Sequence, residues 1–116
     1  MKIDNATWFG LIAVPFVIAV GQILFKMTAV SNAGQGPLGL LSNVTFWIAI
    51  VIYGSATIAW IATIESVPIS RAYLFVALTY LYVPLLSWIF LREQVTYRTF
   101  AGMMIVIVGI VVSVSN

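Results

Sequence analysis

A glutamine and a lysine one helical turn apart are the residues of this chain best equipped for chemistry. Gln22 and Lys26 lie in the stretch GQILFKMTAV, within an apolar segment that starts near Trp8. At about 3.6 residues per turn, both side chains fall on one face of a helix. Such a stripe can line a cavity and bind an anionic ligand. Alternatively, the lysine reaches the membrane surface and the glutamine bonds a neighbouring helix, and the residues alone leave both interpretations open.

Aromatic side chains supply further candidates for binding a polar ligand. Tyr73 and Tyr80 lie two turns apart on one predicted helix face. They can donate hydrogen bonds to a phosphate or a sugar, and they can equally tie two helices together. Trp60 lies far enough inside its segment to favour a pocket over the aromatic belt of the membrane interface.

The remaining candidates are charged and lie near the links between segments: Glu65, Arg71 and Glu93. Glu93 is expected on the same side of the membrane as the Lys26 end of its segment. An ion pair between Lys26 and Glu93 is therefore another interpretation of the lysine. A loose pair that a ligand can exchange is a further one, because buried pairs offset their desolvation only with good geometry.

The composition restricts the functions that these residues can serve. The chain has 116 residues, of which 63% are hydrophobic and 7% are charged. Soluble domains carry roughly 25% charged residues, so this chain belongs in a bilayer. It has no cysteine, no histidine and three acidic residues, and we therefore expect no enzyme, no cofactor and no metal site. Five scattered basic residues form no patch for nucleic acid.

Four apolar segments predict an all-α fold. Each is near the roughly 20 residues that a helix needs to cross the hydrocarbon of a membrane. We expect one domain, residues 1–116, built as a bundle of four transmembrane helices. The predicted helices cover about residues 7–30, 44–64, 69–91 and 97–114. Pro15 and Pro84 are expected to bend the first and third of them.

The last predicted helix carries small residues on one stripe, Gly102 and Gly109 among them. Small side chains let two helices approach closely. We therefore predict that Gly102 and Gly109 pack against another helix or against a second subunit.

Three blocks of the sequence resemble the drug/metabolite transporter superfamily, in its small four-helix, EamA-like branch. The blocks are GQILFKMTA, VPISRAYLFVAL and LSWIFLREQVTYRTFAGMMIVIVGIVVSV. The last one matches the EamA-type order of an apolar helix, a glutamate, a short polar link and glycine-spaced apolar residues. Together the blocks cover most of the chain. The resemblance implies a multi-pass transporter of the bacterial inner membrane, surrounded by membrane lipid.

Two small branches of that superfamily imply different functions. Flippase subunits for aminoarabinose-phosphoundecaprenol are similar in Gly21-Gln22, in Lys26 and in Ala72-Tyr73. That resemblance implies transfer of a polyprenyl-phosphate-linked sugar between leaflets. Small multidrug resistance exporters, which move cationic drugs, are similar in length. They carry a glutamate in the first helix where this chain, aligned on Lys26, has Ile18.

The flippase resemblance implies roles for the candidate residues. Lys26 and Arg71 would hold the phosphate, the arginine through its bidentate fork, and Arg71 is not among the residues that carry the resemblance. The residues expected at the sugar are Gln22, Trp60, Tyr73 and Tyr80, with Glu65 or Glu93 for an amine. Because one such chain is a thin wall for a groove, a homodimer or a heterodimer with a similar small subunit is expected. The alternatives are export of small cationic drugs or metabolites, and a non-transporting partner subunit that acts through Gly102 and Gly109.

Overall fold

The computed structural model describes residues 3–115, and the regular secondary structure of these residues is helical. The helices are α1 (Asn5–Ser31), α2 (Val44–Thr63), α3 (Ile69–Val76), α4 (Thr79–Phe90) and α5 (Tyr97–Val114), with two short 3-10 helices, η1 (Pro37–Ser42) and η2 (Ile64–Ser66). Four stretches are long and apolar enough to cross a membrane, the third formed by α3 and α4 together. The predicted all-α fold with four transmembrane helices is confirmed.

Polar caps mark where three of the helices begin. The Asp4 carboxylate accepts a hydrogen bond from the Thr7 amide at 2.8 Å at the start of α1. Asn43 and Thr96 cap α2 and α5 in the same way, each accepting from amides of the following turn. These bonds satisfy N–H groups that the first turn of a helix leaves without a partner.

The third apolar segment is predicted as one helix over about 69–91, and the structure divides it at Ala77 and Leu78. The amides of these two residues donate to the carbonyls of Leu74 and Phe75, three residues back, at 3.1 and 2.9 Å. This 3-10-type pairing tightens the chain between α3 and α4. Pro84 lies farther on, inside α4. Because Ala77 and Leu78 are good helix formers, the sequence carries no local signal for this break.

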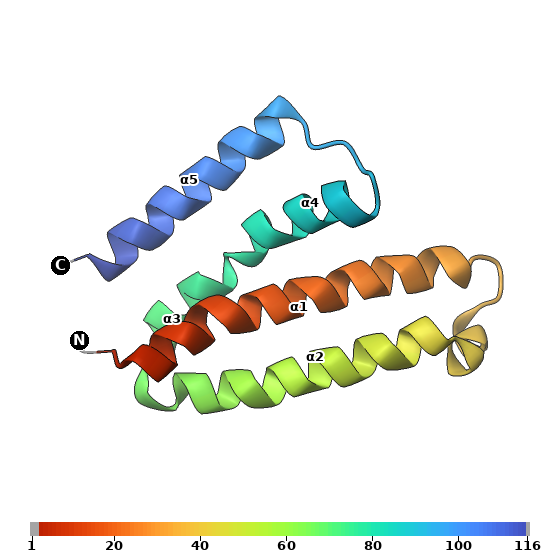
Figure 1. The fold of residues 1–116 in the computed structure, drawn as a ribbon, viewed down its shortest axis with the longest axis horizontal. Helices are drawn as coiled ribbons and strands as arrows, with labels where there is room; N and C mark the ends of the chain where they lie inside the picture. Colours follow the sequence, from red (N-terminus) through yellow and green to blue (C-terminus); the bar gives the residue numbers. More distant parts are fainter. Residues whose placement is uncertain (1–2, 116) are drawn as a thin grey trace.

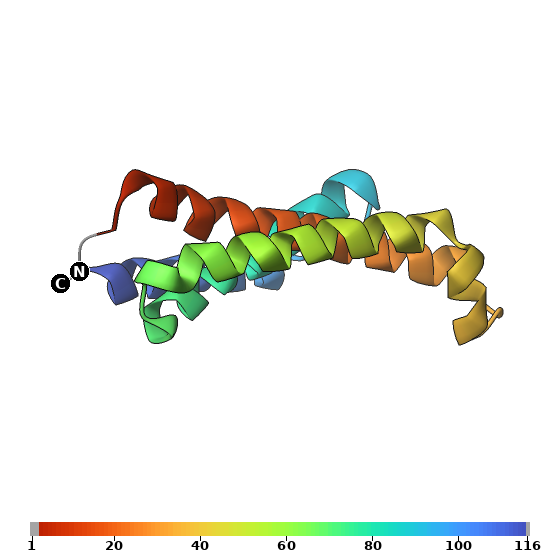
Figure 2. The same cartoon turned by 90° about the horizontal axis from the view of Figure 1, so that it is seen from below.

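The helices form a thin layer with α1 near its middle. The described chain measures 50 × 35 × 19 Å, so its smallest dimension is less than two helix diameters. Helix α1 packs mainly against α2 on one side and against α4 on the other, and α5 lies beyond α4 with few contacts (Figures 1 and 2).

The buried core is divided into two clusters along α1. The first joins the early part of α1, represented by Leu11, to Ala72 and Phe75 of α3 and to Ile110 of α5. The second joins Ala19 and Ile23 of α1 to Leu86 of α4. The later half of α1, which carries Lys26, is therefore positioned by α4 and by α2, and not by α3.

A candidate substrate groove on one face of the layer

Two hollows meet on one face of the α1–α4 pair, and together we call them the polar groove. Gln22, Val83 and Pro84 line both hollows. The hollow toward the end of α1 has a volume of about 450 Å³, and the one toward the middle of the layer about 500 Å³. Their polar lining residues are Gln22, Lys26, Tyr53, Thr79, Tyr80, Ser87, Glu93, Gln94 and Thr99.

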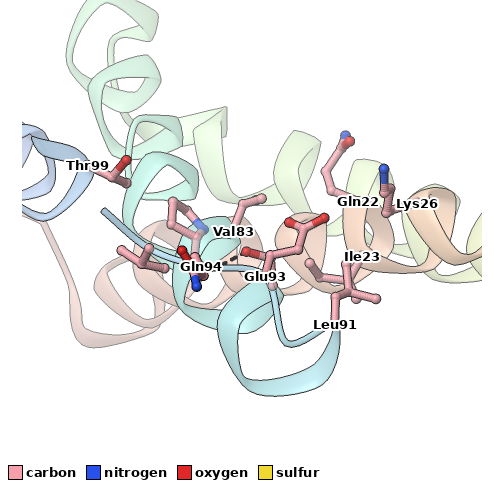
Figure 3. A pocket seen from close by; sticks show the side chains of 11 residues that line it. Gln22, Ile23, Lys26, Val83, Leu91, Glu93, Gln94 and Thr99 are labelled. Atoms are coloured by element: carbon pink, nitrogen blue, oxygen red, sulfur yellow. Dashed lines mark hydrogen bonds between the residues drawn. The ribbon is translucent and has the colours of Figure 1, made fainter. Parts of the chain in front are cut away.

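The end of the groove near the carboxyl terminus of α1 combines the amide of Gln22, the ammonium of Lys26 and the carboxylate of Glu93. Gln22 and Lys26 are both exposed and extend from one face of α1 (Figure 3). Ile23, one residue after Gln22, is buried and forms part of the groove wall with Leu91. An open groove with these groups can receive a ligand that carries an anionic and a cationic group.

The link after α4 brings Glu93 into this groove by folding back over the helix. Arg92 adopts a left-handed backbone with φ 57°, which reverses the chain. The Glu93 amide then donates to the Ser87 carbonyl at 3.2 Å. Figure 3 shows the Glu93 side chain directed toward the side of the groove that holds Gln22 and Lys26. No hydrogen bond joins Lys26 and Glu93 among the side chains drawn there, and their ion pair stays a prediction.

The other end of the groove lies at the break between α3 and α4 and is rich in hydroxyl groups. Tyr80 is exposed there, and Thr79 donates a hydrogen bond to the Val76 carbonyl at 2.8 Å. Tyr53 enters from α2, with its ring 5.5 Å from that of Phe25. Hydroxyl groups at this point can bond a sugar or a phosphate.

Of the seven residues predicted to bind substrate, the groove brings together Gln22, Lys26 and Tyr80. The other four, Trp60, Glu65, Arg71 and Tyr73, belong to the opposite end of the layer. Trp60 packs on the core cluster of Leu11, and Arg71 directly precedes Ala72 of the same cluster. Lys26 lies about four turns beyond Leu11, roughly 22 Å along the axis of α1.

Lys26 and Arg71 therefore do not meet at one phosphate within a single chain. The flippase resemblance implied that shared role, although the predicted order of the helices already places the two residues on opposite sides of the membrane. Helix α1 is continuous, however, and the link before α3 returns to its beginning, so the two side chains lie near opposite surfaces of the membrane.

Several lining residues escaped the prediction of site residues: Tyr53, Thr79, Ser87, Gln94 and Thr99. The polar composition of the link REQVTYR is the signal that could have identified Gln94. Thr99 and the hydroxyls inside apolar helices carry no such signal. Ser87, for example, donates to the Pro84 carbonyl at 2.9 Å, which is an ordinary role for serine in a membrane helix.

The described chain is a thin helical layer with four membrane-crossing stretches and a polar groove on one face. Residues 3–115 match the EamA-like transporter family, and the chain belongs to this family. The prediction of a small EamA-like drug/metabolite transporter is thereby confirmed.

The chain is similar to curated proteins described as probable 4-amino-4-deoxy-L-arabinose-phosphoundecaprenol flippase subunit ArnE. The one from Klebsiella pneumoniae (strain 342) is 28% identical over 110 residues, which cover 92% of this chain and 95% of the relative. The one from Enterobacter sp. (strain 638) is 29% identical over 91 residues, covering 78% and 80%. The one from Salmonella newport (strain SL254) is 28% identical over 105 residues, covering 80% and 95%. No solved structure matches this chain.

The family match and the four membrane-crossing helical stretches make this chain a multi-pass transporter of the inner membrane. This agrees with the localisation that the sequence predicts.

Proposed function

We propose that the chain is a flippase, or one subunit of a flippase, that moves a polyprenyl-phosphate-linked sugar between the leaflets of the inner membrane without a chemical step. The single observation that carries the proposal is the position of Lys26 and Gln22 in an open groove within an apolar span. Ionisable side chains inside membrane spans are costly and mark substrate pathways when they face a cavity. The similarity to flippase subunits supports the class of substrate.

The chemistry of such a substrate fits the groove. The Lys26 ammonium can bond the phosphate, and charge-assisted hydrogen bonds of this kind are among the strongest that side chains make. Gln22 and Tyr80 can bond the sugar hydroxyls. Glu93 can bond an amine if the sugar carries one. The groove then replaces the water that the headgroup loses on leaving the membrane surface.

In the proposed mechanism, the residues at the opposite end of the layer form the second part of the route that the substrate headgroup takes across the membrane. Arg71 is half-buried and Tyr73 is exposed near the start of α3, with Glu65 in the link before it and Trp60 at the end of α2. In the proposed mechanism they receive the headgroup in the other leaflet. The phosphate thus meets Lys26 and Arg71 one after the other and not together.

A dimer would close the groove on its open side. The described chain is only 19 Å thick, and its groove lies on one face of that layer. A second copy, or a similar small subunit, facing it would enclose the headgroup. Gly102 and Gly109 on α5 have open space around them within the described chain, and they are the surface that we propose for the contact.

Replacement of Lys26 tests the proposal. The chain is reconstituted in vesicles, and translocation of a fluorescent polyprenyl-phosphate sugar is measured by quenching from outside. Lys26→Ala is expected to slow translocation about 10- to 100-fold, because it removes a hydrogen bond to a charged group. Lys26→Arg is expected to keep most of the activity. Arg98→Ala, which removes an exposed cation outside the groove lining, is the matched control. Unchanged transport by a well-expressed Lys26→Ala protein would exclude the lysine from the mechanism.

Export of a small cation is the second candidate function, and the carboxylate of Glu93 in the groove is the observation that favours it. Small multidrug resistance exporters hold their carboxylate in the first helix, where this chain has Ile18. Glu93→Gln would abolish efflux of quaternary ammonium compounds if this candidate is correct. Translocation of an amine-free lipid-linked sugar would be little changed by the same variant.

A further inference from the structure

The face of the α1–α4 pair opposite the polar groove carries an apolar trough. Its volume is about 270 Å³, and its lining residues are Val20, Ile23, Leu24, Met27, Leu86 and Phe90. At about 100° per residue, Val20 and Leu24 lie on the side of α1 away from Gln22. The lining side chains are apolar throughout. The two faces of this helix pair therefore offer two different environments, one for polar groups and one for hydrocarbon.

An opening at the end of α1 connects the two faces, and we call it the portal. It has a volume of about 430 Å³ and is lined in part by Lys26, Met27, Leu91 and Glu93. Lys26, Leu91 and Glu93 also line the polar groove, and Met27 also lines the trough. Ile23 lines both the groove and the trough and is buried between them. These shared lining residues join the charged groups of the polar groove to the apolar trough around this edge.

We propose that the portal and the trough bind the isoprenoid chain of the lipid-linked substrate while its phosphate lies at Lys26. This inference rests on the proposed function and adds the path of the hydrocarbon chain. The substrate is a single molecule with an ionic head and an apolar chain, so its site must join a cation to an apolar surface within a few bonds. Lys26 and Met27, adjacent in sequence and both in the portal lining, make that junction.

The trough is better suited to bind a flexible hydrocarbon chain than to pack against the rigid surface of another protein. Met27 and Phe90 are 43% and 68% exposed at its edges, and methionine adapts its shape to irregular apolar ligands. The trough is small, so it holds the part of the chain next to the phosphate, and the rest extends into the bilayer. A helix of a partner subunit is the other occupant that could cover this surface, and it becomes an outcome of the experiment.

Photo-crosslinking from the trough tests the site directly. p-Benzoylphenylalanine replaces Phe90 in the trough, or Ile58 of α2, which is 72% exposed and away from the trough. The probe is radiolabelled undecaprenyl phosphate in vesicles of phosphatidylethanolamine and phosphatidylglycerol. We expect at least fivefold more label at position 90 than at position 58, and loss of this excess with Lys26→Ala. Equal labelling at both positions, or capture of a second protein chain from position 90, would overturn the proposal.

Filling the trough gives an independent test with transport as the readout. Met27→Trp places a bulky ring where the chain should lie, and Ile58→Trp is the matched control on α2. We expect Met27→Trp to slow transport of the long-chain substrate at least tenfold more than that of an analogue with two isoprene units. Met27→Trp could instead slow transport of both substrates equally while Lys26→Ala still slows transport. The trough would then be excluded as the binding site of the isoprenoid chain, and the flippase function would stand. If position 90 is labelled in a Lys26-dependent way and no variant or wild-type chain transports, the site stands and the flippase function is excluded.

Discussion

In the α1–α2 hairpin, Gly10 and Gly21 face side chains of the neighbouring helix, whereas Gly102 and Gly109 of α5 face open space within the described chain. A Cβ atom at Gly10 would collide with Thr63, and one at Gly21 would lie 3.1 Å from the Tyr53 ring. The same residue type, on four helical positions in apolar segments, thus has two different structural settings.

The surroundings of these glycines explain the difference. Helix α1 lies between α2 and α4 and carries a large share of the buried residues, while α5 touches the rest of the chain along a narrow stripe. Large apolar side chains next to the α5 glycines stay exposed, among them Ile105, Val108 and Val112. The small residues Gly10 and Gly21 of α1 pack against α2 within the chain. Those in α5 stay available for another molecule, which supports the proposed dimer surface.

The largest expected effect is that of Gly10→Leu on folding. The leucine would overlap the Thr63 side chain and separate α1 from α2, and overpacking of this kind costs about 1–3 kcal/mol. The measurement is the free energy of unfolding in mixed detergent micelles. Gly102→Leu is the control and is expected to leave it within about 0.5 kcal/mol. Equal destabilisation by both variants would remove the distinction between the two helices.

The next effect is that of Gly109→Leu on assembly. The added side chain is expected to weaken subunit association about tenfold, or about 1.4 kcal/mol, without changing the fold of the chain. Association is measured by energy transfer between labelled chains in liposomes, with Lys26→Ala as the control that leaves association intact. A fully associated Gly109→Leu protein would mean that the α5 face does not form the contact. Suppose that Gly109→Leu abolishes transport by the assembled complex while variants of the groove residues leave it unchanged. The chain would then act as a non-transporting partner subunit through the α5 face.

A double-mutant cycle at Gly21 and Tyr53 sharpens the description of the α1–α2 contact. Gly21→Ala places its Cβ against the Tyr53 ring, and we expect a loss of about 1 kcal/mol. In a Tyr53→Leu background the same change should cost less, because the ring that it meets is gone. Unfolding free energies of the four proteins give the coupling. A coupling of zero would show that the two residues do not limit the approach of the helices.

The smallest expected effect is a pH dependence of the stability of the first turn of α1. The first turn of α5, which has a cap that does not titrate, serves as the comparison. Hydrogen bonds from the Thr7 side chain and amide lower the pKa of the Asp4 carboxyl below its ordinary value of 3.8. The cap therefore stabilises α1 fully at pH values above 3.8, and this contribution is lost as the pH falls through the lower pKa of the folded state. The Thr96 cap of α5 does not titrate.

Hydrogen exchange at the Thr7 amide measures this effect. In the wild-type chain, the exchange rate of the Thr7 amide, divided by that of the Thr99 amide, should rise below pH 3.8. In Asp4→Asn, whose amide caps helices without titrating, the ratio should stay constant. A constant ratio in the wild-type chain would show that the carboxylate does not hold the helix start.

The amino-acid sequence alone is sufficient to predict the all-α architecture, the four membrane-crossing stretches and the shared stripe of Gln22 and Lys26. The physical reason is local: hydrocarbon requires the backbone to satisfy its own hydrogen bonds, and helical periodicity then assigns each side chain to a face. The packing of the helices added that the link after α4 returns Glu93 to the groove, that Tyr53 of α2 enters it, and that the third span breaks at Ala77. Those outcomes depend on which helices pack together and on where one link turns back, and no short stretch of residues encodes either.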